Sequence, residues 1–177
     1  MPFSNPLFRE EIADFVKKTF PDFEKTTILD VGPGIGTYAD LLSEYKNIDA
    51  CEIYKRYIRR YGLQQKYRKV FCQDIQSFEF DYYDLVIMGD VLEHIKTKQA
   101  IKVVNRILEH CQEIIVKVPL QTRKRKTRPY LGNIYEVHQQ IILTPKIMKR
   151  RYPMLQPLYE KDGKAGVYIR NIKENLK

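Results

Sequence analysis

Residues 28–37 read ILDVGPGIGT, an apolar strand that runs directly into three alternating glycines. A chain that turns from a strand into a helix while a ligand touches its backbone needs residues without a Cβ atom. Glycine alone adopts the unusual φ/ψ angles and leaves room for close approach. The dinucleotide fingerprint G-x-G-x-x-G would place its third glycine at position 37, where this chain has Thr37. The stretch therefore predicts a nucleotide-binding turn and disfavours NAD.

Acidic residues follow at the ends of the next two predicted strands. Glu52 closes the strand 48–52, roughly twenty residues beyond the glycines, where a carboxylate can bind two ribose hydroxyls through paired hydrogen bonds. Asp74 follows the strand 69–72. Each has a plainer alternative: Glu52 as a solvated charge that opens a helix, and Asp74 as an ordinary turn aspartate.

A fourth strand, 84–89, leads into the run GDVLEH at residues 89–94. With D-x-G-x-G-x-G at 30–36 and the two acidic strand ends, the order and spacing of these elements resemble the class I S-adenosylmethionine-dependent methyltransferases over residues 26–120. An acidic side chain two residues before the first glycine suits a cationic cofactor that carries no phosphate. The resemblance implies that S-adenosylmethionine is the cofactor and that its contacts are Asp30, Gly32, Gly34, Gly36, Glu52, Ile53, Asp74, Ile75, Gly89 and Asp90.

Apolar segments alternate with amphipathic ones along the chain, and this alternation predicts an α/β fold. The family fold is a doubly wound, mostly parallel seven-stranded sheet with a C-terminal β-hairpin, one strand of which is antiparallel to the rest. We expect helices at 6–20, 37–45, 54–61, 97–110 and 144–151, and strands at 26–32, 48–52, 69–72, 84–89, 113–118, 155–160 and 166–171. Asn5-Pro6 is the expected cap and first position of the first helix.

Length and composition fit one domain. The 177 residues suffice for a single buried core. We expect an N-terminal helix in 1–22, a cofactor-binding core in 23–120, a basic substrate-side segment in 121–152 and the hairpin in 153–177. The chain has no apolar run as long as a membrane span and no signal-peptide pattern, so we expect a cytoplasmic protein that does not bind membranes. The three cysteines, Cys51, Cys72 and Cys111, are expected to be small core residues.

Positive charge gathers in one stretch. Residues 117–151 hold ten Lys and Arg and one acid, Glu136, while the whole chain has a net charge of +9. The loop 121–128 follows the fifth strand, whose carboxyl end opens on the same edge of the sheet as the predicted cofactor site. We expect it beside the acceptor entrance, where it would attract an anionic acceptor. A solvated loop without function is the alternative.

Methyl transfer from S-adenosylmethionine requires few catalytic groups from the protein. The sulfonium of S-adenosylmethionine supplies the driving force, so the protein aligns a nucleophile and, for a hydroxyl acceptor, removes its proton. Asp90-x-x-Glu93-His94 resembles the loop of quinone-type and other small-molecule O-methyltransferases. His94 is the expected base because its unperturbed pKa lies near neutrality. The same residues are also common where a helix start simply caps and packs.

A second polar segment, Asn133-x-Tyr135-x-x-His138, resembles one that lies over the active site in small methyltransferases of glycan and secondary-metabolite gene clusters. We therefore expect Tyr135 and His138 to act with Asp90 and His94 on the acceptor. Some quinone and small-RNA methyltransferases bind a divalent ion through an E-x-x-E-H loop. Because aspartate replaces the first glutamate here and no second downstream histidine of the RNA type follows, we expect no metal.

The acceptor class remains open. Nucleic-acid methyltransferases usually carry an appended recognition module, and we expect none in a chain of this length. Gly89-Asp90-Val91-Leu92 stands where base-amino methyltransferases carry Asn/Asp-Pro-Pro-Tyr/Phe/Trp. Both absences favour O-methylation of a small molecule or sugar hydroxyl. Thirteen tyrosines and a basic surface keep RNA or another nucleic acid as the alternative. A non-catalytic S-adenosylmethionine-binding protein is a third interpretation.

Overall fold

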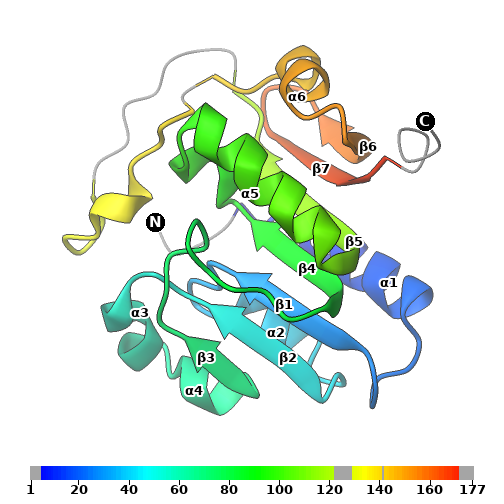
Figure 1. The fold of residues 1–177 in the computed structure, drawn as a ribbon, viewed down its shortest axis with the longest axis vertical. Helices are drawn as coiled ribbons and strands as arrows, with labels where there is room; N and C mark the ends of the chain where they lie inside the picture. Colours follow the sequence, from blue (N-terminus) through cyan, green and yellow to red (C-terminus); the bar gives the residue numbers. More distant parts are fainter. Residues whose placement is uncertain (1–4, 122–128, 141, 172–177) are drawn as a thin grey trace.

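The computed structural model describes residues 5–121, 129–140 and 142–171 (Figure 1). The strands are β1 (Thr27–Val31), β2 (Asn47–Cys51), β3 (Lys69–Phe71), β4 (Tyr83–Gly89), β5 (Cys111–Pro119), β6 (Leu155–Lys161) and β7 (Ala165–Arg170). The helices are α1 (Arg9–Thr19), α2 (Thr37–Leu41), α3 (Lys55–Arg60), α4 (Leu63–Lys66), α5 (Thr97–Glu109) and α6 (Pro145–Arg151), with short 3-10 turns η1 (Leu92–His94) and η2 (Ile134–Glu136).

The seven strands form one sheet in the order β3-β2-β1-β4-β5-β7-β6. Strands β1 to β5 are parallel, and β7 runs antiparallel to both of its neighbours. The fold prediction, including the C-terminal hairpin, is confirmed. Continuous apolar runs such as 85–88 form strands buried on both faces, as a parallel sheet covered by helices requires.

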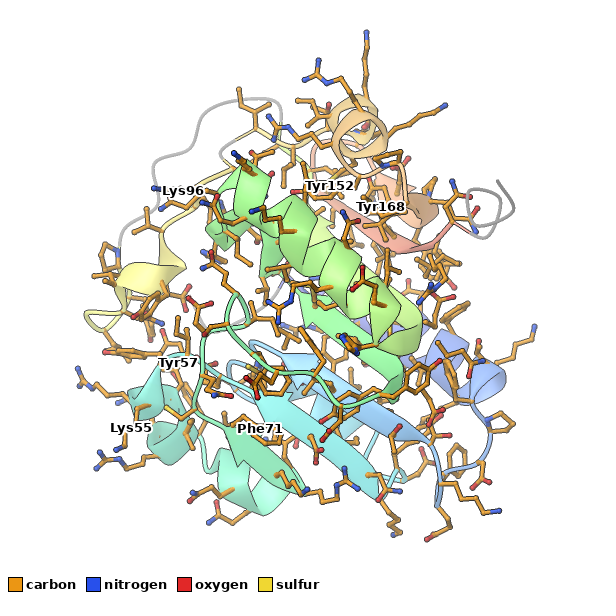
Figure 2. All side chains as sticks on the ribbon, in the orientation of Figure 1. Lys55, Tyr57, Phe71, Lys96, Tyr152 and Tyr168 are labelled. Atoms are coloured by element: carbon orange, nitrogen blue, oxygen red, sulfur yellow. The ribbon has the colours of Figure 1, made fainter. Side chains whose placement is uncertain are left out.

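Helices cover both faces of the sheet (Figure 1). On one face, α5 buries Ala100, Val103, Val104 and Ile107, whose i, i+3, i+4, i+7 spacing makes one apolar stripe. Each of the larger side chains contributes about 1.5–3 kcal/mol by leaving water. Figure 2 shows Tyr152 and Tyr168 beside the same helix, in the same core cluster. The second cluster lies under α1 and α2 on the other face.

Several local predictions need correction. The first helix begins at Arg9 and not at position 6, because the Asn5 side chain instead accepts a hydrogen bond from the Leu7 amide (3.0 Å) and Phe8 takes a left-handed conformation (φ 67°). The second helix ends at Leu41, and α4 was not predicted. Cys72 is exposed, whereas the other two cysteines are buried as expected.

Two other expectations meet the limits of the described residues. The basic loop prediction falls on residues 122–128, outside the described part of the chain. Within the described ranges, no helix is long and apolar enough to cross a membrane.

The expected helix at 144–151 is present as α6. Thr144 caps it, since its hydroxyl accepts a hydrogen bond from the Ile147 amide at 3.2 Å.

Candidate active site

The turn after β1 depends on its glycines. Gly32, Gly34 and Gly36 all have positive φ angles, of 63°, 56° and 85°. A Cβ atom on Gly32 would lie 2.5 Å from Val91 Cγ2, and one on Gly36 would lie 2.7 Å from Lys66 Cδ. Other residues would therefore strain the backbone and clash with neighbours at this turn. The turn confirms the steric reasoning from the sequence and places α2 with its N-terminus at the carboxyl edge of the sheet.

A pocket of about 820 Å³, its open mouth included, lies at that edge. Its walls come from the carboxyl ends of β1 to β4 and from η2, as doubly wound sheets commonly place their ligands. The lining residues are Val31, Gly32, Gly34, Cys51, Glu52, Ile53, Tyr57, Gln73, Asp74, Ile75, Gln76, Gly89, Asp90, Val91, His94, Ile95, Asn133, Tyr135 and Glu136.

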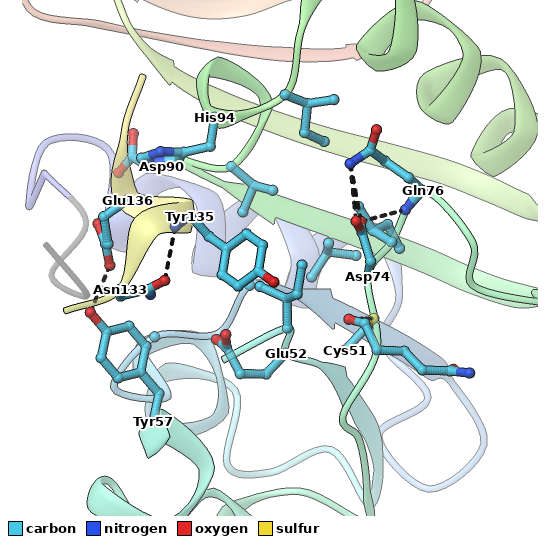
Figure 3. Close-up of a pocket in the computed structure, with 18 of the residues that line it drawn as sticks. Cys51, Glu52, Tyr57, Asp74, Gln76, Asp90, His94, Asn133, Tyr135 and Glu136 are labelled. Atoms are coloured by element: carbon cyan, nitrogen blue, oxygen red, sulfur yellow. Dashed lines mark hydrogen bonds between the residues drawn. The ribbon is translucent and has the colours of Figure 1, made fainter. Parts of the chain in front are cut away.

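The two acidic strand ends line this pocket as the sequence predicted (Figure 3). Glu52 is buried and accepts a hydrogen bond from the Tyr54 amide at 2.7 Å. Burial raises the pKa of Glu52 to about 7, against the lowering effect of backbone hydrogen bonds from Tyr54 and Gly34. Asp74 accepts from the Gln76 amide at 2.9 Å, so it also forms the turn that its plainer alternative describes.

Three of the predicted site residues do not line the pocket: Asp30, Gly36 and His138. Asp30 lies within the sheet, where the Tyr67 hydroxyl donates a hydrogen bond to it at 2.6 Å. Burial raises the pKa of Asp30 to about 7. A direct cofactor contact from Asp30 stays a prediction.

The loop after β4 brings Asp90 and His94 to the pocket. Asp90 has a left-handed backbone (φ 56°), and a Cβ on the preceding Gly89 would lie 2.7 Å from Tyr38 Cε2. The Asp90 carboxylate pairs with the ammonium of Lys117 at 2.6 Å. Lys117 is fully buried, so its charge, counted in the basic stretch 117–151, is not part of a basic surface.

The segment 130–138 closes the pocket opposite the strand ends. Figure 3 shows Asn133, Tyr135 and Glu136 on the segment that carries η2, across the pocket from Glu52 and Tyr57. The Tyr57 hydroxyl donates a buried hydrogen bond to Glu136 at 2.9 Å, which ties η2 to α3. Tyr57 and Glu136 were not predicted as site residues. The signal was present, because Glu136 is the lone acid among the ten basic residues of 117–151.

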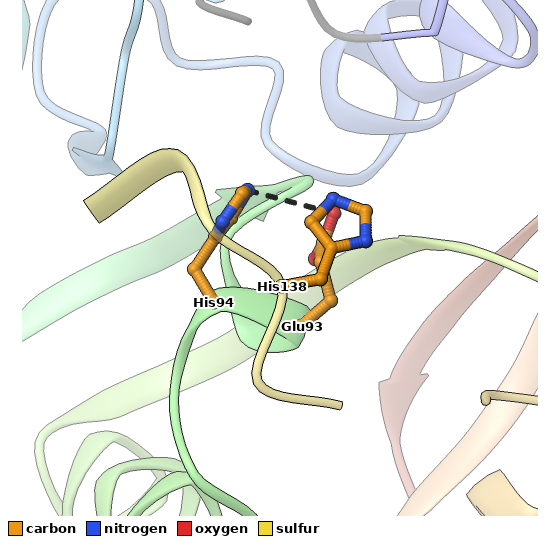
Figure 4. A group of neighbouring side chains, drawn as sticks. All are labelled: Glu93, His94 and His138. Atoms are coloured by element: carbon orange, nitrogen blue, oxygen red, sulfur yellow. Dashed lines mark ion pairs between the residues drawn. The ribbon is translucent and has the colours of Figure 1, made fainter. Parts of the chain in front are cut away.

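Figure 4 shows that His94 and His138 meet edge to face, with ring centroids 4.8 Å apart. Glu93 is buried beside them, and its Oε1 lies 4.0 Å from His94 Nε2. One donor atom from each of the three residues lies within 4.8 Å of the others. This carboxylate and two imidazoles would suit a divalent ion of the transition series. Asp90, which stands where the E-x-x-E-H loop has its first glutamate, is bound by Lys117 and is not part of this cluster.

The pKa values of His94 and His138 are both lowered, which favours the neutral imidazoles. Burial lowers the pKa of His94, while the charge of Glu136 and a backbone hydrogen bond to Val137 act in the opposite direction. Burial and the neighbouring His94 lower the pKa of His138 to about 4. His94 at pH 7 is therefore an uncharged imidazole at a pocket wall, the state that a general base requires.

The chain is similar in sequence to known proteins. A family model described as a methyltransferase domain matches residues 7–144. The chain belongs to this family. A ubiquinone biosynthesis O-methyltransferase of Rickettsia canadensis is 24% identical over 179 residues, which cover 96% of this chain and 74% of that protein. An uncharacterized protein of Methanocaldococcus jannaschii is 32% identical over 120 residues, 67% of this chain and about half (51%) of that relative.

Solved structures agree on the methyltransferase fold. S-adenosylmethionine-bound CalS10, an amino pentose methyltransferase from Micromonospora echinaspora, superposes with a TM-score of 0.62 at 12% identity, covering 91% of this chain and 89% of that one. The fold is the class I methyltransferase fold that the sequence resemblance implied. This methyltransferase therefore uses S-adenosylmethionine as its cofactor.

Proposed function

We propose that this methyltransferase transfers the methyl group of S-adenosylmethionine to a hydroxyl group of a small molecule or sugar. The observation that carries the proposal is the position of His94, a partly buried imidazole held toward its neutral form on the same pocket wall as Gly89 and Asp90. A neutral imidazole is the form that removes a hydroxyl proton. The O-methyltransferase relative and the sugar methyltransferase neighbour support the same acceptor class.

The residues at the strand ends fit the cofactor. Glu52 places a buried carboxylate in the pocket beside the glycine turn, and two ribose hydroxyls would satisfy its oxygens. Asp74 and the backbone of Ile75 line the next part of the pocket, where they would receive the adenine. Gly32 and Gly34 leave their backbone uncovered at the wall between these groups and Gly89.

The remaining residues act on the acceptor. The cofactor supplies an electrophilic methyl group on a sulfonium, which needs no further activation. His94 accepts the proton of the acceptor hydroxyl. Tyr135, which is half-exposed at the pocket mouth, orients the acceptor, and His138 contacts the His94 ring from outside the pocket lining. If a divalent ion binds, Glu93, His94 and His138 would hold it, and it would polarise the same hydroxyl.

The pocket itself argues for a compact acceptor. The segment 130–138 approaches α3 closely enough for the Tyr54 hydroxyl to donate to the Leu131 carbonyl at 2.9 Å. A nucleic acid would have to enter past this contact. Because Lys117 is buried, it cannot attract an anionic acceptor, and the case for such an acceptor is weaker. We therefore place a neutral or weakly charged small acceptor ahead of RNA.

The experiment is a transfer assay with isotope-labelled S-adenosylmethionine. A panel of simple phenols, catechols and aryl glycosides would be offered beside a mixed short RNA, and each labelled product would be identified by NMR of its methyl group. We expect label on a hydroxyl oxygen of a small acceptor. Label in RNA alone, or on nitrogen alone, would contradict the proposal.

A further inference from the structure

Lys117 is a fully buried lysine whose ammonium has defined partners at the edge of the pocket. Its Nζ donates hydrogen bonds to the Asp90 carboxylate at 2.6 Å and to the Asn5 carbonyl at 2.8 Å. The Asn5 amide in turn donates to the same Asp90 oxygen, Oδ2, at 3.0 Å. Lys117 and Asp90 thus bind the carbonyl and the amide of Asn5, and these contacts place Asn5 next to a residue that lines the pocket.

This arrangement leaves one oxygen of Asp90 uncommitted. Oδ2 receives both hydrogen bonds, whereas Oδ1 is buried and has no hydrogen-bond partner among the described residues. An unsatisfied carboxylate oxygen out of water is costly unless a ligand completes it. The left-handed backbone of Asp90 (φ 56°) is a further local cost, which is typical of functional sites.

Sheet order gives the direction in which a ligand would approach that oxygen. Glu52 and Asp74 follow β2 and β3, Asp90 follows β4, and β1 with its glycine turn lies between them. With the adenosine of S-adenosylmethionine at Glu52 and Asp74, as proposed above, its amino-acid end extends past the glycines toward Asp90. The group at that end with which a carboxylate oxygen forms its strongest hydrogen bond is the α-ammonium.

We infer that Lys117 is a positioning residue for cofactor binding: it fixes the Asp90 carboxylate so that Oδ1 accepts the α-ammonium of S-adenosylmethionine. The inference rests on the cofactor orientation given under the proposed function. A plain structural ion pair is the competing explanation, because a buried pair can often be replaced by uncharged residues without loss of stability. The two explanations differ in which part of the cofactor should lose affinity.

The test compares two ligands by calorimetry. S-adenosylhomocysteine carries the amino-acid end, and 5′-methylthioadenosine lacks it but keeps the adenosine. For Asp90→Asn we expect S-adenosylhomocysteine to bind about tenfold or more weakly, because a charged hydrogen bond is lost, and 5′-methylthioadenosine to change by less than about twofold. For Lys117→Met we expect the same selective loss at about fivefold, because the carboxylate is no longer held in place.

The double variant Asp90→Asn/Lys117→Met covers the case in which Lys117→Met fails to fold, since it removes both charges together. It should resemble Asp90→Asn because the two residues act as one unit. Equal weakening of both ligands, unchanged binding of both, or tighter binding of S-adenosylhomocysteine to Lys117→Met would each overturn the inference. Lys17→Met, which removes a surface ion pair with Glu44, is the matched control.

Glu52→Gln separates this inference from the cofactor orientation on which it rests. If the adenosine lies at Glu52, this variant weakens both ligands alike. Weakening of S-adenosylhomocysteine alone by Glu52→Gln would show that the orientation itself is wrong, whatever Lys117→Met does.

Discussion

The two walls of the pocket are built in different ways. The cofactor wall, formed by the ends of β1, β2 and β3, is fixed by parallel backbone pairing and by a glycine turn. The acceptor wall, formed by η1 and residues 130–140, is held mainly by single side-chain contacts such as Tyr57 to Glu136 and Gln140 to the Leu92 carbonyl at 2.8 Å. In the proposed function, backbone pairing therefore fixes the wall that binds the cofactor, whereas a few side-chain contacts fix the wall that binds the acceptor.

Exposure shows the same difference. Among the described residues, four large hydrophobic side chains are exposed, and three of them, Leu131, Ile134 and Tyr135, belong to the acceptor wall. The cofactor wall contributes none. Of these three side chains, Tyr135 lines the pocket, and an exposed apolar side chain there offers a surface that a ligand can cover. Substitutions in the two walls should therefore affect different measurements, and the largest effects should come from residues that face the reacting atoms.

His94→Ala tests the acceptor wall and should have the largest effect. If His94 removes the acceptor proton, turnover should fall by about 10² or more while the Kd for S-adenosylhomocysteine changes by less than about twofold. Steady-state kinetics and calorimetry measure the two quantities. His110→Ala, which changes a histidine that stacks on Phe80, is the control. Turnover abolished by a chelator and restored by a divalent transition-metal ion would instead make His94 a metal ligand.

Glu52→Ala tests the cofactor wall. Loss of charged hydrogen bonds to the ribose should weaken S-adenosylhomocysteine binding by roughly 1.5–3 kcal/mol. Since the pKa of Glu52 is raised to about 7 and the ionised form accepts these bonds, wild-type affinity should also decline as the pH falls from 8 to 6. Glu52→Gln should lose that pH dependence. Glu44→Ala, on the surface, is the control, and an unchanged Kd for Glu52→Ala would return Glu52 to a structural role.

Asp30→Asn separates folding from binding on the cofactor wall. The folded-state pKa of Asp30 is raised from 3.8 to about 7, so its stabilising contribution is complete below pH 4 and declines as the pH rises through 7. The wild-type free energy of unfolding should therefore lose about 2 kcal/mol between pH 5 and 8 that the variant keeps. Denaturant unfolding at both pH values measures this loss, with Asp22→Asn as control. Parallel pH curves for variant and wild type would contradict it.

Tyr57→Phe tests the contact that joins the two walls, and its effect should be the smallest. The variant removes the hydrogen bond to Glu136 and should lower the free energy of unfolding by about 1 kcal/mol. Because Glu136 lines the pocket, the acceptor KM should rise a few-fold while kcat stays nearly constant. Tyr82→Phe, at an exposed tyrosine, is the control. A fall in kcat with constant KM would place Tyr57 in the chemical step.

The cofactor wall was largely predictable from the sequence. Buried parallel strands leave continuous apolar runs, and the turn leaves its glycines, so Gly32, Gly34, Glu52 and Asp74 were placed correctly at the pocket. Asp30 lies in the same motif but points to Tyr67. Its orientation is set by a tyrosine 37 residues away, which no local pattern reveals.

The acceptor wall was predictable only in part. His94 and Tyr135 line the pocket as expected, because each belongs to a short polar motif. The pairing of Tyr57 with Glu136 spans 79 residues, and that of Lys117 with Asp90 spans 27. Such contacts depend on how distant segments meet. Lys117 was counted with the basic stretch 117–151, because charge counting does not show which lysine a strand carries into the interior.

Apart from η1, the acceptor wall is one piece of chain, residues 130–140, which follows β5 and lies outside the strands of the sheet. Substitutions in residues 130–140 can therefore change the acceptor range while the strands, the glycine turn and the cofactor contacts stay unchanged. In evolution, this segment can diverge independently of the cofactor-binding core. Grafting it between relatives of this fold is correspondingly the shortest route to an enzyme with a new acceptor.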